Sequence, residues 1–168
     1  VADGLGVRMD RVRVESTNTR RVANMSPTAA SSGADLNGAA ALDAVRQILA
    51  RLRPVAASML ADPAGGLAPA PEHVRFEGGR VLDDRDPARS LSFEEVVAQA
   101  HLRRVDLCAH GFWATPGVEF NRETGRGTPF AYYVFGAAVT EVTVDLLTGA
   151  TVVDAVTIVH DAGQSLDP

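Results

Sequence analysis

The chain contains few cysteines and no long hydrophobic run, and these two shortages exclude several classes of protein. Cys108 is the only cysteine among 168 residues, so an internal disulfide is impossible and a reducing cytoplasm is the expected location. No apolar run approaches the roughly 20 residues that a membrane-spanning helix needs. We therefore expect neither a disulfide-stabilised scaffold nor a membrane-embedded protein.

Concentrated positive charge is also missing. The net charge is −5, and the arginines are scattered rather than gathered in the basic stripe that nucleic-acid binding requires. The histidines are equally dispersed, so the sequence offers no cluster with the spacing of metal ligands: His73, His101, His110 and His160. With 46% hydrophobic residues the chain has enough apolar material for a globular core.

Helical and strand-like patterns alternate along the chain, which predicts an α/β (α+β) fold with a two-layer mixed sheet packed against helices. Apolar residues recur with helical spacing from Leu36 to Leu60, and Pro54 is expected to kink or break that helix. Alternation in Arg11–Thr17 predicts a short strand. Apolar runs on either side of Gly78-Gly79 predict a hairpin within Val74–Leu82.

The second half of the chain carries further signals. Ser92 and Glu95 have the spacing of a capping box, which predicts the start of a second helix. Residues 105–116 are expected to form a strand, and residues 117–129 a polar loop. The segment from Phe130 begins as a nearly continuous apolar run, which is typical of a strand covered on both faces, and it should turn at residues 147–149 into a partner strand.

The chain is expected to be one segment of a larger domain. It divides into residues 1–60, a Pro/Gly/Ala-rich linker at residues 61–71, and residues 72–168. The opening VADGLGV reads as the tail of a helix that closes on Gly4 or Gly6, and both ends look cut. We therefore expect this chain to be an excised piece of a longer polypeptide.

The stretch Ser26–Gly38, SPTAASSGADLNG, consists almost entirely of small or turn-forming residues and leads directly into the expected long helix. The first N–H groups of a helix have no partner within it, and together with the helix dipole they attract negative charge. The pattern therefore indicates either an anion-binding loop or a polar turn in which Asp35 or Asn37 caps the helix. Small residues that admit close backbone approach, and hydroxyl donors beside them, are Ala29, Ala30, Gly33, Thr28, Ser31 and Ser32.

Several motifs then resemble one family, in family order. NMSPTAASSGADLNG is similar to the threonine-alanine-alanine-serine loop of the xanthine dehydrogenase / aldehyde oxidase family of molybdenum hydroxylases, and RVRVESTNTRRVAN resembles the segment before it. Three further stretches resemble elements that follow this loop in the family's sequences: GFWATP (residues 111–116), GRGTPFAYYVFGAAVTEVTVDLLTG and HDAGQSLDP. The resemblance covers essentially the whole chain apart from residues 56–71, and it is greatest to the large subunit of bacterial xanthine dehydrogenases.

The resemblance implies a molybdenum–molybdopterin cofactor in this subunit, with 2Fe-2S clusters and FAD in partner domains or subunits. Such enzymes hydroxylate purine or other N-heterocycle carbons with oxygen from water. Carried over to this sequence, the hydroxyls of Thr28 and Ser31 would bind the pterin or its phosphate. Ala29 and Ala30 would bring backbone close to molybdenum, with Ala30 nearest. Backbone contact alone is expected at Gly33 and Ala34.

No catalytic residue is assigned by the resemblance, because the family's general-base glutamate would lie after Pro168 and its substrate-stacking phenylalanines before Val1. The pair His160-Asp161 is interpreted as a strand end whose polar groups hold the following turn. Phe112 and Trp113 are interpreted in two ways, as residues that line a substrate channel or as aromatic residues of the core. Glu119 is interpreted as a solvated loop residue. Glu141 is interpreted as a residue on the polar face of a strand.

Three kinds of function remain open. The first is part of a xanthine dehydrogenase-like oxidoreductase, inactive by itself, whose partners are the remainder of the large subunit, an iron–sulfur/FAD subunit and a small-molecule substrate. Relatives that oxidise aldehydes or other heterocycles are the close alternative. The second is a non-catalytic scaffold of the same fold. The third is a small phosphate- or nucleotide-binding domain, although the glycine-rich fingerprint of such domains is missing.

Overall fold

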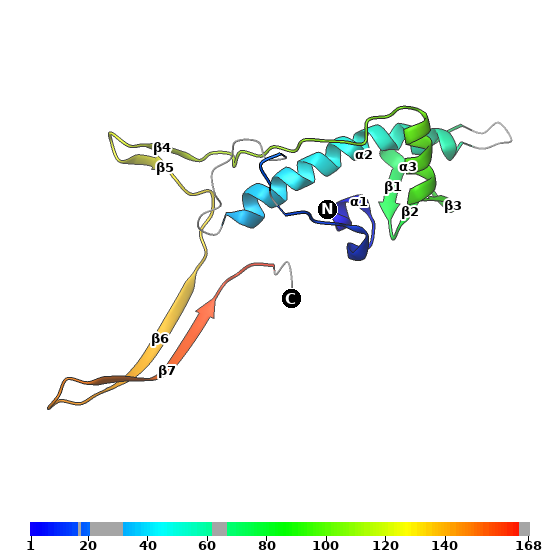
Figure 1. Ribbon diagram of the computed structural model, residues 1–168. Helices are drawn as coiled ribbons and strands as arrows, with labels where there is room; N and C mark the ends of the chain where they lie inside the picture. Colours follow the sequence, from blue (N-terminus) through cyan, green and yellow to red (C-terminus); the bar gives the residue numbers. More distant parts are fainter. Residues whose placement is uncertain (17, 21–31, 62–66, 165–168) are drawn as a thin grey trace. The chain divides into compact units, whose positions relative to one another are not determined.

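The computed structural model describes the chain in two compact units, Val1–Ala114 and Thr115–Pro168, each of which is considered by itself (Figure 1). The described residues are 1–16, 18–20, 32–61 and 67–164. Among the helices in these ranges, none is both long and apolar enough to cross a membrane.

The first unit begins with a short helix, α1 (Ala2–Leu5), and a single 3-10 turn (Met9–Arg11). As predicted, α1 closes on Gly6, which adopts the left-handed conformation with φ of 64°. A Cβ at this position would lie 2.2 Å from the carbonyl oxygen of Phe76, so both the backbone angle and the space require glycine.

The centre of this unit is the long helix α2 (Ala39–Met59), which confirms the helix predicted from the apolar periodicity. The helix is not broken at Pro54. Proline removes one backbone hydrogen bond, but Leu52, Val55 and Ala56 on either side are buried and hold the helix in place through packing. A π-helical turn (Gly33–Gly38) precedes α2.

The predicted helix cap is wrong. The residues at the two cap positions, Ser32 and Gly38, make no side-chain capping bond, while Asp35 and Asn37 lie inside the π-helical turn instead of at its boundary. The wider turn therefore starts the helix several residues before the regular α-helical hydrogen bonds begin.

A small antiparallel sheet in the order β1-β2-β3 packs beside α2. The predicted hairpin is confirmed, with β1 (Val74–Glu77) and β2 (Arg80–Asp83) joined through Gly78 and Gly79, both at positive φ. The third strand, β3 (Asp86–Ser92), was not predicted, because Pro87 and its charged neighbours hide the alternating pattern.

Helix α3 (Phe93–Leu102) follows β3 directly and confirms the predicted capping box. The backbone N–H of Glu95 donates to the Ser92 hydroxyl at 3.2 Å, and the Ser92 N–H donates to the Glu95 carboxylate at 2.7 Å. Side chains from α2, α3 and the small sheet together form the core of this unit: Leu52, Val55, Ala56, Ala57, Leu60, Val74, Val81, Val96 and Ala100.

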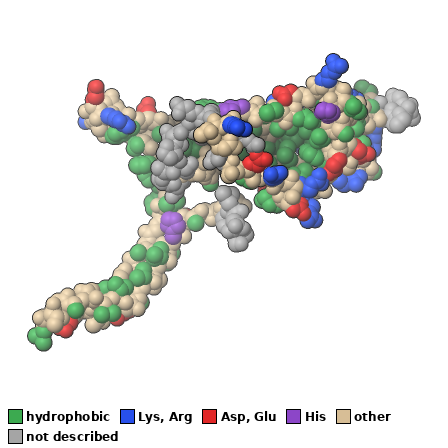
Figure 2. Space-filling view, viewed as in Figure 1, with side chains coloured by type: hydrophobic (Ala, Val, Ile, Leu, Met, Phe, Trp, Pro, Cys, Tyr) green, Lys and Arg blue, Asp and Glu red, His purple; other side chains and the backbone are tan. Residues whose placement is uncertain are grey.

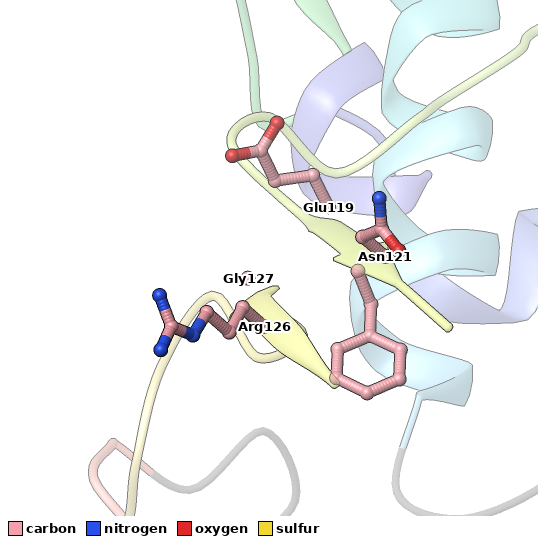
Figure 3. Close-up of a pocket in the computed structure, with 5 residues that line it drawn as sticks. Glu119, Asn121, Arg126 and Gly127 are labelled. Atoms are coloured by element: carbon pink, nitrogen blue, oxygen red, sulfur yellow. The ribbon is translucent and has the colours of Figure 1, made fainter. Parts of the chain in front are cut away.

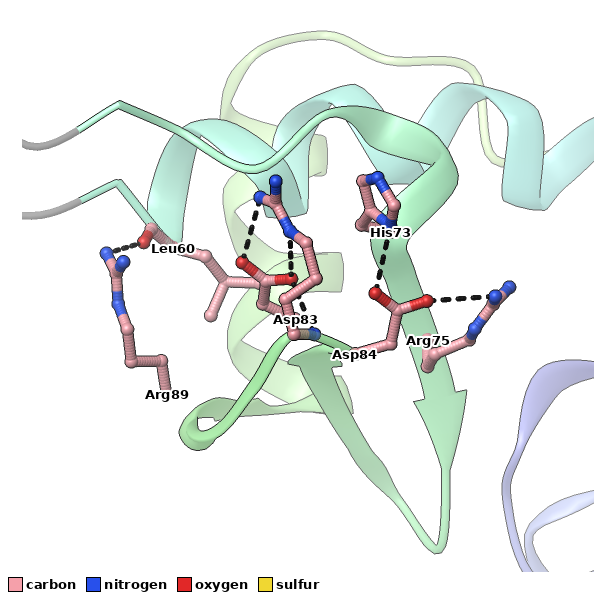
Figure 4. A network of polar contacts seen from close by, with 7 residues as sticks. Leu60, His73, Arg75, Asp83, Asp84 and Arg89 are labelled. Atoms are coloured by element: carbon pink, nitrogen blue, oxygen red, sulfur yellow. Dashed lines mark hydrogen bonds and ion pairs between the residues drawn. The ribbon is translucent and has the colours of Figure 1, made fainter.

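Charged groups close the turn after β2 (Figure 4). Asp83 is only 4% exposed, and Arg85 donates to its carboxylate through both its backbone N–H and its side chain. The Arg85 side chain thereby lowers the pKa of Asp83. Asp84 bridges His73 at 3.0 Å and Arg75 at 2.9 Å. These bonds tie the turn between β2 and β3 to β1.

Two predicted strands of the first unit are wrong. After the 3-10 turn that ends at Arg11, residues 12–16 are irregular and pair with no strand among the described residues. Residues 105–114 are also irregular, although the chain is extended there. An alternating pattern predicts an extended chain, but a strand also requires a neighbouring strand to accept its hydrogen bonds.

The described part of the second unit, residues 115–164, contains two hairpins. The first joins β4 (Glu119–Asn121) and β5 (Arg126–Thr128), so the polar loop predicted for residues 117–129 is wrong. Its turn is held by the Asn121 side chain, which accepts from the backbone N–H groups of Glu123 and Thr124. A short polar hairpin of this kind lacks the apolar alternation by which strands are recognised in a sequence.

The second hairpin joins β6 (Gly136–Val144) and β7 (Thr151–His160) through the predicted turn at residues 147–149. The strand begins at Gly136 rather than at Phe130. Every residue of both strands is exposed, so the described residues of this unit cover neither face of the hairpin, contrary to the expectation. In Figure 2, apolar side chains are spread along this hairpin.

The α+β class is confirmed, because helices combine with antiparallel sheets. The mixed sheet is not found among the described residues: every pair of strands is antiparallel, and the strands form three separate sheets. Each sheet is built from strands adjacent in the chain, which explains why local turn signals located the hairpins β1–β2 and β6–β7, although they missed β3 and the β4–β5 hairpin.

Candidate functional site

The loop that leads into α2 is the candidate binding site. Its residues Thr28, Ala29, Ala30 and Ser31 lie outside the described residues, so their roles stay predictions. Gly33 and Ala34 are described, and they form the first part of the π-helical turn, with Gly33 half-buried and Ala34 exposed. The roles expected of these two residues also stay predictions, but their position at the start of a helix can be examined.

The start of α2 has properties that suit an anionic ligand. The helical run begins at Gly33, where Ser32 at the cap position makes no side-chain capping bond, whereas the first N–H of α2 itself, on Ala39, donates to the carbonyls of Asp35 and Leu36 within the turn. An added Cβ at Gly38 would meet no atom within 4 Å, which shows open space at the end of the turn. The small side chains of Gly33, Ala34 and Gly38 suit a close approach of a ligand to the backbone of the turn.

A second motif from the sequence lies along the same helix. The extended segment Asp106–Phe112 runs antiparallel to α2 and is bound by three helix side chains. Arg51 donates to the carbonyl oxygens of Asp106 and Cys108 at 2.7 and 3.0 Å. Gln47 donates to the carbonyl oxygen of His110 at 3.2 Å. The carboxylate of Asp43 accepts from the backbone N–H of Phe112 at 3.2 Å.

The spacing of these contacts explains why a helix can replace a partner strand. Asp43, Gln47 and Arg51 are four residues apart and share one face of α2. Four helical residues rise about 6 Å, and two residues of extended chain advance about 6.6 Å. The helix side chains therefore meet every second residue of the segment. Val105 and Leu107 of the same stretch of chain pack against the core.

Gly111 brings the segment into direct contact with the first turn of α2. A Cβ at this position would lie 1.8 Å from the carbonyl oxygen of Ala40 and 2.8 Å from the amide nitrogen of Ala44. Only a glycine permits this approach, because both neighbours are backbone atoms that cannot move aside. The GFWATP motif thus meets α2 close to the point where the small-residue loop enters the helix.

The aromatic residues that follow are not part of the core. Phe112 is 73% exposed and Trp113 is 37% exposed. The interpretation as core residues is therefore wrong within this chain. The interpretation as lining of a substrate channel stays a prediction.

The other candidate groups are exposed side chains of the second unit. Glu119 lies on β4 beside an open hollow of about 370 Å³ that is lined by exposed residues of the β4–β5 hairpin (Figure 3). Glu141 is exposed on β6, as expected of a solvated strand residue. The carboxylate of Asp161 accepts from the backbone N–H of Gly163 at 3.0 Å, which confirms that it holds the turn after β7.

Comparison with known proteins decides the family. The sequence model of a molybdopterin cofactor-binding domain matches residues 1–168. The chain belongs to this family. It is 38% identical over 167 residues to a xanthine dehydrogenase of rice (Oryza sativa subsp. japonica), covering 99% of the chain and 10% of that protein. It is 34% identical to a xanthine dehydrogenase of Dictyostelium discoideum and 34% identical to a xanthine dehydrogenase/oxidase of chicken (Gallus gallus).

The matches with rice, Dictyostelium and chicken cover 98–99% of the chain but only about a tenth of each relative. These relatives are eukaryotic, so they lend no support to the prediction that bacterial members are the best match. Membership supports the predicted class of cofactor. The described end of the loop fits a phosphate-bearing cofactor, since Gly33 and Ala34 are small residues at the start of the helical run, where Ser32 makes no side-chain capping bond.

Sequence reasoning missed the stripe formed by Asp43, Gln47 and Arg51. The sequence does contain the signal: three polar residues at four-residue spacing on a helix whose other face is apolar. The usual reading of such a face is that it points to solvent. Only the structure shows that these side chains bind backbone groups of residues 106–112. Asp43 accepts a hydrogen bond from a backbone N–H, and Gln47 and Arg51 donate to backbone carbonyl oxygens.

Proposed function

We propose that this chain is the cofactor-cradling segment of a xanthine dehydrogenase-like molybdenum hydroxylase. The observation that carries the proposal is the small-residue loop that enters α2 without a side-chain cap, in a chain of the molybdopterin cofactor-binding family. Similarity to xanthine dehydrogenases over nearly the whole chain supports a purine or related N-heterocycle as the substrate.

The chain's own residues would bind and position the cofactor. Backbone N–H groups of Gly33 and Ala34 would donate to the anionic part of the pterin, and the hydroxyls of Thr28 and Ser31 would add further donors. Ala30 would admit the metal centre closely, because its methyl group leaves the backbone accessible. When bound, a molybdenum–pterin group supplies the oxidation of an electron-poor carbon with oxygen derived from water.

Proton transfer is assigned to residues outside this chain. Glu119 and Glu141 are exposed, and no bond to either carboxylate is found among the described contacts that would orient it toward a substrate. A general base must lie within hydrogen-bonding reach of the proton that it removes and be held there. We therefore expect the isolated chain to be inactive and to bind the cofactor weakly or not at all.

The remaining parts of the enzyme follow from the same proposal. The remainder of the large subunit would complete the site, and 2Fe-2S clusters and FAD in partner domains would receive the electrons. A cytoplasmic location and a bacterial source belong to the same proposal. An aldehyde or another N-heterocycle is the alternative substrate, because substrate choice would depend on residues outside this segment. A scaffold of the same fold without metal is the non-catalytic alternative.

The test is the molybdenum content of two samples: the full-length gene product made in a host that synthesises the cofactor, and residues 1–168 alone. We expect about one molybdenum per full-length chain and none in the segment. Full-length protein without molybdenum would favour the scaffold. Reduction of the full-length enzyme by xanthine, compared with an aldehyde, then distinguishes the substrates.

A further inference from the structure

The β6–β7 hairpin has two chemically different faces. Residues paired across an antiparallel ladder point to the same side of the sheet, and the side alternates along each strand. One side, which we call the apolar face, carries aliphatic side chains from both strands: Ala138, Val142, Val144, Val153, Val156 and Ile158. Its other positions are threonines, with His160 beside Gly136 at the open end of the hairpin.

The opposite side, which we call the polar face, carries both carboxylates of the two strands, Glu141 and Asp154. Asp154 is the extra residue of a β-bulge, inserted between the partners of Glu141 and Val142. The hydroxyl of Thr143 donates to its carboxylate at 2.6 Å, which places Asp154 on the side of Thr143 and Glu141. Without the extra residue, strict alternation would move Val153 to that side. The bulge therefore keeps the apolar face continuous.

The apolar face is not suited to contact with water. Val156 is 55% exposed and Ile158 is 67% exposed. No aspartate, glutamate, lysine or arginine occurs on this face, although charged residues are the usual protection of strands that stay in solvent. A single two-stranded hairpin is at best marginally stable in water and needs a further strand or a packed layer. These properties indicate that another apolar surface covers this face.

The size of the face decides what can cover it. The nine residues of β6 extend about 30 Å and two strands are about 10 Å wide, so the footprint is about 300 Å². Doubled for the relief of the side chains, it stays below the about 800 Å² that each partner of a stable complex buries. A second copy of the chain would therefore bind this face too weakly to cover it.

A surface within the same polypeptide needs less area, because the connecting chain keeps it near the hairpin at an effective concentration in the millimolar range. The rice xanthine dehydrogenase leaves ample room for such a surface, since the match covers only 10% of that protein. The chemistry that fits is an aliphatic face of a sheet or helix without charged groups, because burying an unpaired charge against these side chains would be costly.

We propose that the apolar face of the β6–β7 hairpin docks against an apolar sheet or helix surface of the remainder of the longer polypeptide, whereas the polar face stays in contact with water. The inference rests on the proposed function only in its occupant, the remainder of the large subunit. It adds which side of the hairpin is covered, and it gives the bulge at Asp154 the role of keeping that side free of carboxylates.

The experiment introduces single cysteines into the full-length protein at four consecutive positions of β7: Val156→Cys, Thr157→Cys, Ile158→Cys and Val159→Cys. Positions 156 and 158 belong to the apolar face, and their neighbours 157 and 159 on the polar face are matched controls. Cysteine is small and is tolerated in buried positions. Reaction with a maleimide is followed by mass spectrometry of the peptide that contains β7, so the exposed Cys108 does not interfere. Each rate is divided by the rate of the same variant unfolded in urea.

The two apolar-face variants should react at least about tenfold more slowly than the two controls, because a reagent reaches a covered side chain only when the structure opens locally. Equal rates at all four positions, or slower reaction at 157 and 159, would overturn the inference. Protection that disappears on dilution would overturn it in favour of a second copy. If one apolar-face variant does not fold, the other decides the question with its own neighbour.

Molybdenum content, measured on the unmodified full-length protein, separates the two proposals. Alternating protection in a protein without molybdenum would keep the inference and overturn the proposed function. Molybdenum together with equal rates at all four positions would do the reverse.

Discussion

Replacing Gly111 with alanine should detach the extended segment from α2, and the size of the effect follows from the geometry. The new Cβ would lie 1.8 Å from the carbonyl oxygen of Ala40, so the segment must move by more than about 1 Å to reach van der Waals contact. The bonds on either side, Asp43 to Phe112 and Gln47 to His110, are both already 3.2 Å long. A movement of this size would break both bonds.

The expected loss of stability is about 3 kcal/mol, since a bond to a charged acceptor contributes about 1.5–3 kcal/mol and a neutral one about 1 kcal/mol. Urea unfolding of the chain measures it. Trp113 is the only tryptophan and lies two residues from the substitution, so its fluorescence should shift toward that of a solvent-exposed indole in the folded variant. Far-UV circular dichroism should confirm that α2 persists.

Gly38→Ala is the matched control. Gly38 has an ordinary helical φ of −64°, and an added Cβ meets no atom within 4 Å. Alanine should therefore leave stability unchanged or raise it by up to about 1 kcal/mol, because it restricts the unfolded chain. If Gly111→Ala unfolds at the same urea concentration as Gly38→Ala and leaves the fluorescence of Trp113 unchanged, the extended segment does not lie as close to α2 at Gly111 as described.

Three further changes test other parts of the first unit by urea unfolding. Ser92→Ala should cost about 1 kcal/mol through loss of the capping box, and no change would show that α3 does not depend on it. Leu52→Ala should cost about 2–5 kcal/mol because Leu52 is 1% exposed in the core, whereas a loss below about 1 kcal/mol would contradict its burial. The pKa of Asp83 is lowered by Arg85, so its contribution to stability is present above the ordinary aspartate value of 3.8 and is lost as the pH falls below it. Asp83→Asn should therefore make the stability to urea less dependent on pH in this acidic range. If the acid dependence is unchanged in this variant, the Asp83–Arg85 pair does not contribute to it.

Local signals in the sequence predicted the elements whose hydrogen bonds are local. The capping box at Ser92, the glycine turn at residues 78–79 and the turn at residues 147–149 were confirmed because neighbouring residues complete them. The strand predicted for residues 105–116 was wrong for the opposite reason. The partner that binds the backbone of this segment is a helix more than fifty residues earlier in the chain, and not a neighbouring strand.

The candidate site was predictable only in part. The small residues before α2 indicated a helix start that a ligand can approach; the structure places Gly33 and Ala34 in the first part of the π-helical turn, and their contacts with a cofactor stay a prediction. The support that Asp43 gives to Phe112 was not predictable, because polar spacing on a helix face does not reveal which distant backbone it meets. The caps predicted at Asp35 and Asn37 were wrong because the π-helical turn starts the helical run at Gly33, before both residues.

The open hairpin β6–β7 has a consequence for handling the chain by itself. Its two strands expose apolar side chains such as Val139, Val156 and Ile158, and within the described residues neither outer edge pairs with a further strand. An unprotected edge beside apolar side chains is a template for adding strands from other molecules. Preparations of the segment alone should therefore aggregate as their concentration rises, and substitutions of Val139 or Ile158 by lysine should delay this aggregation.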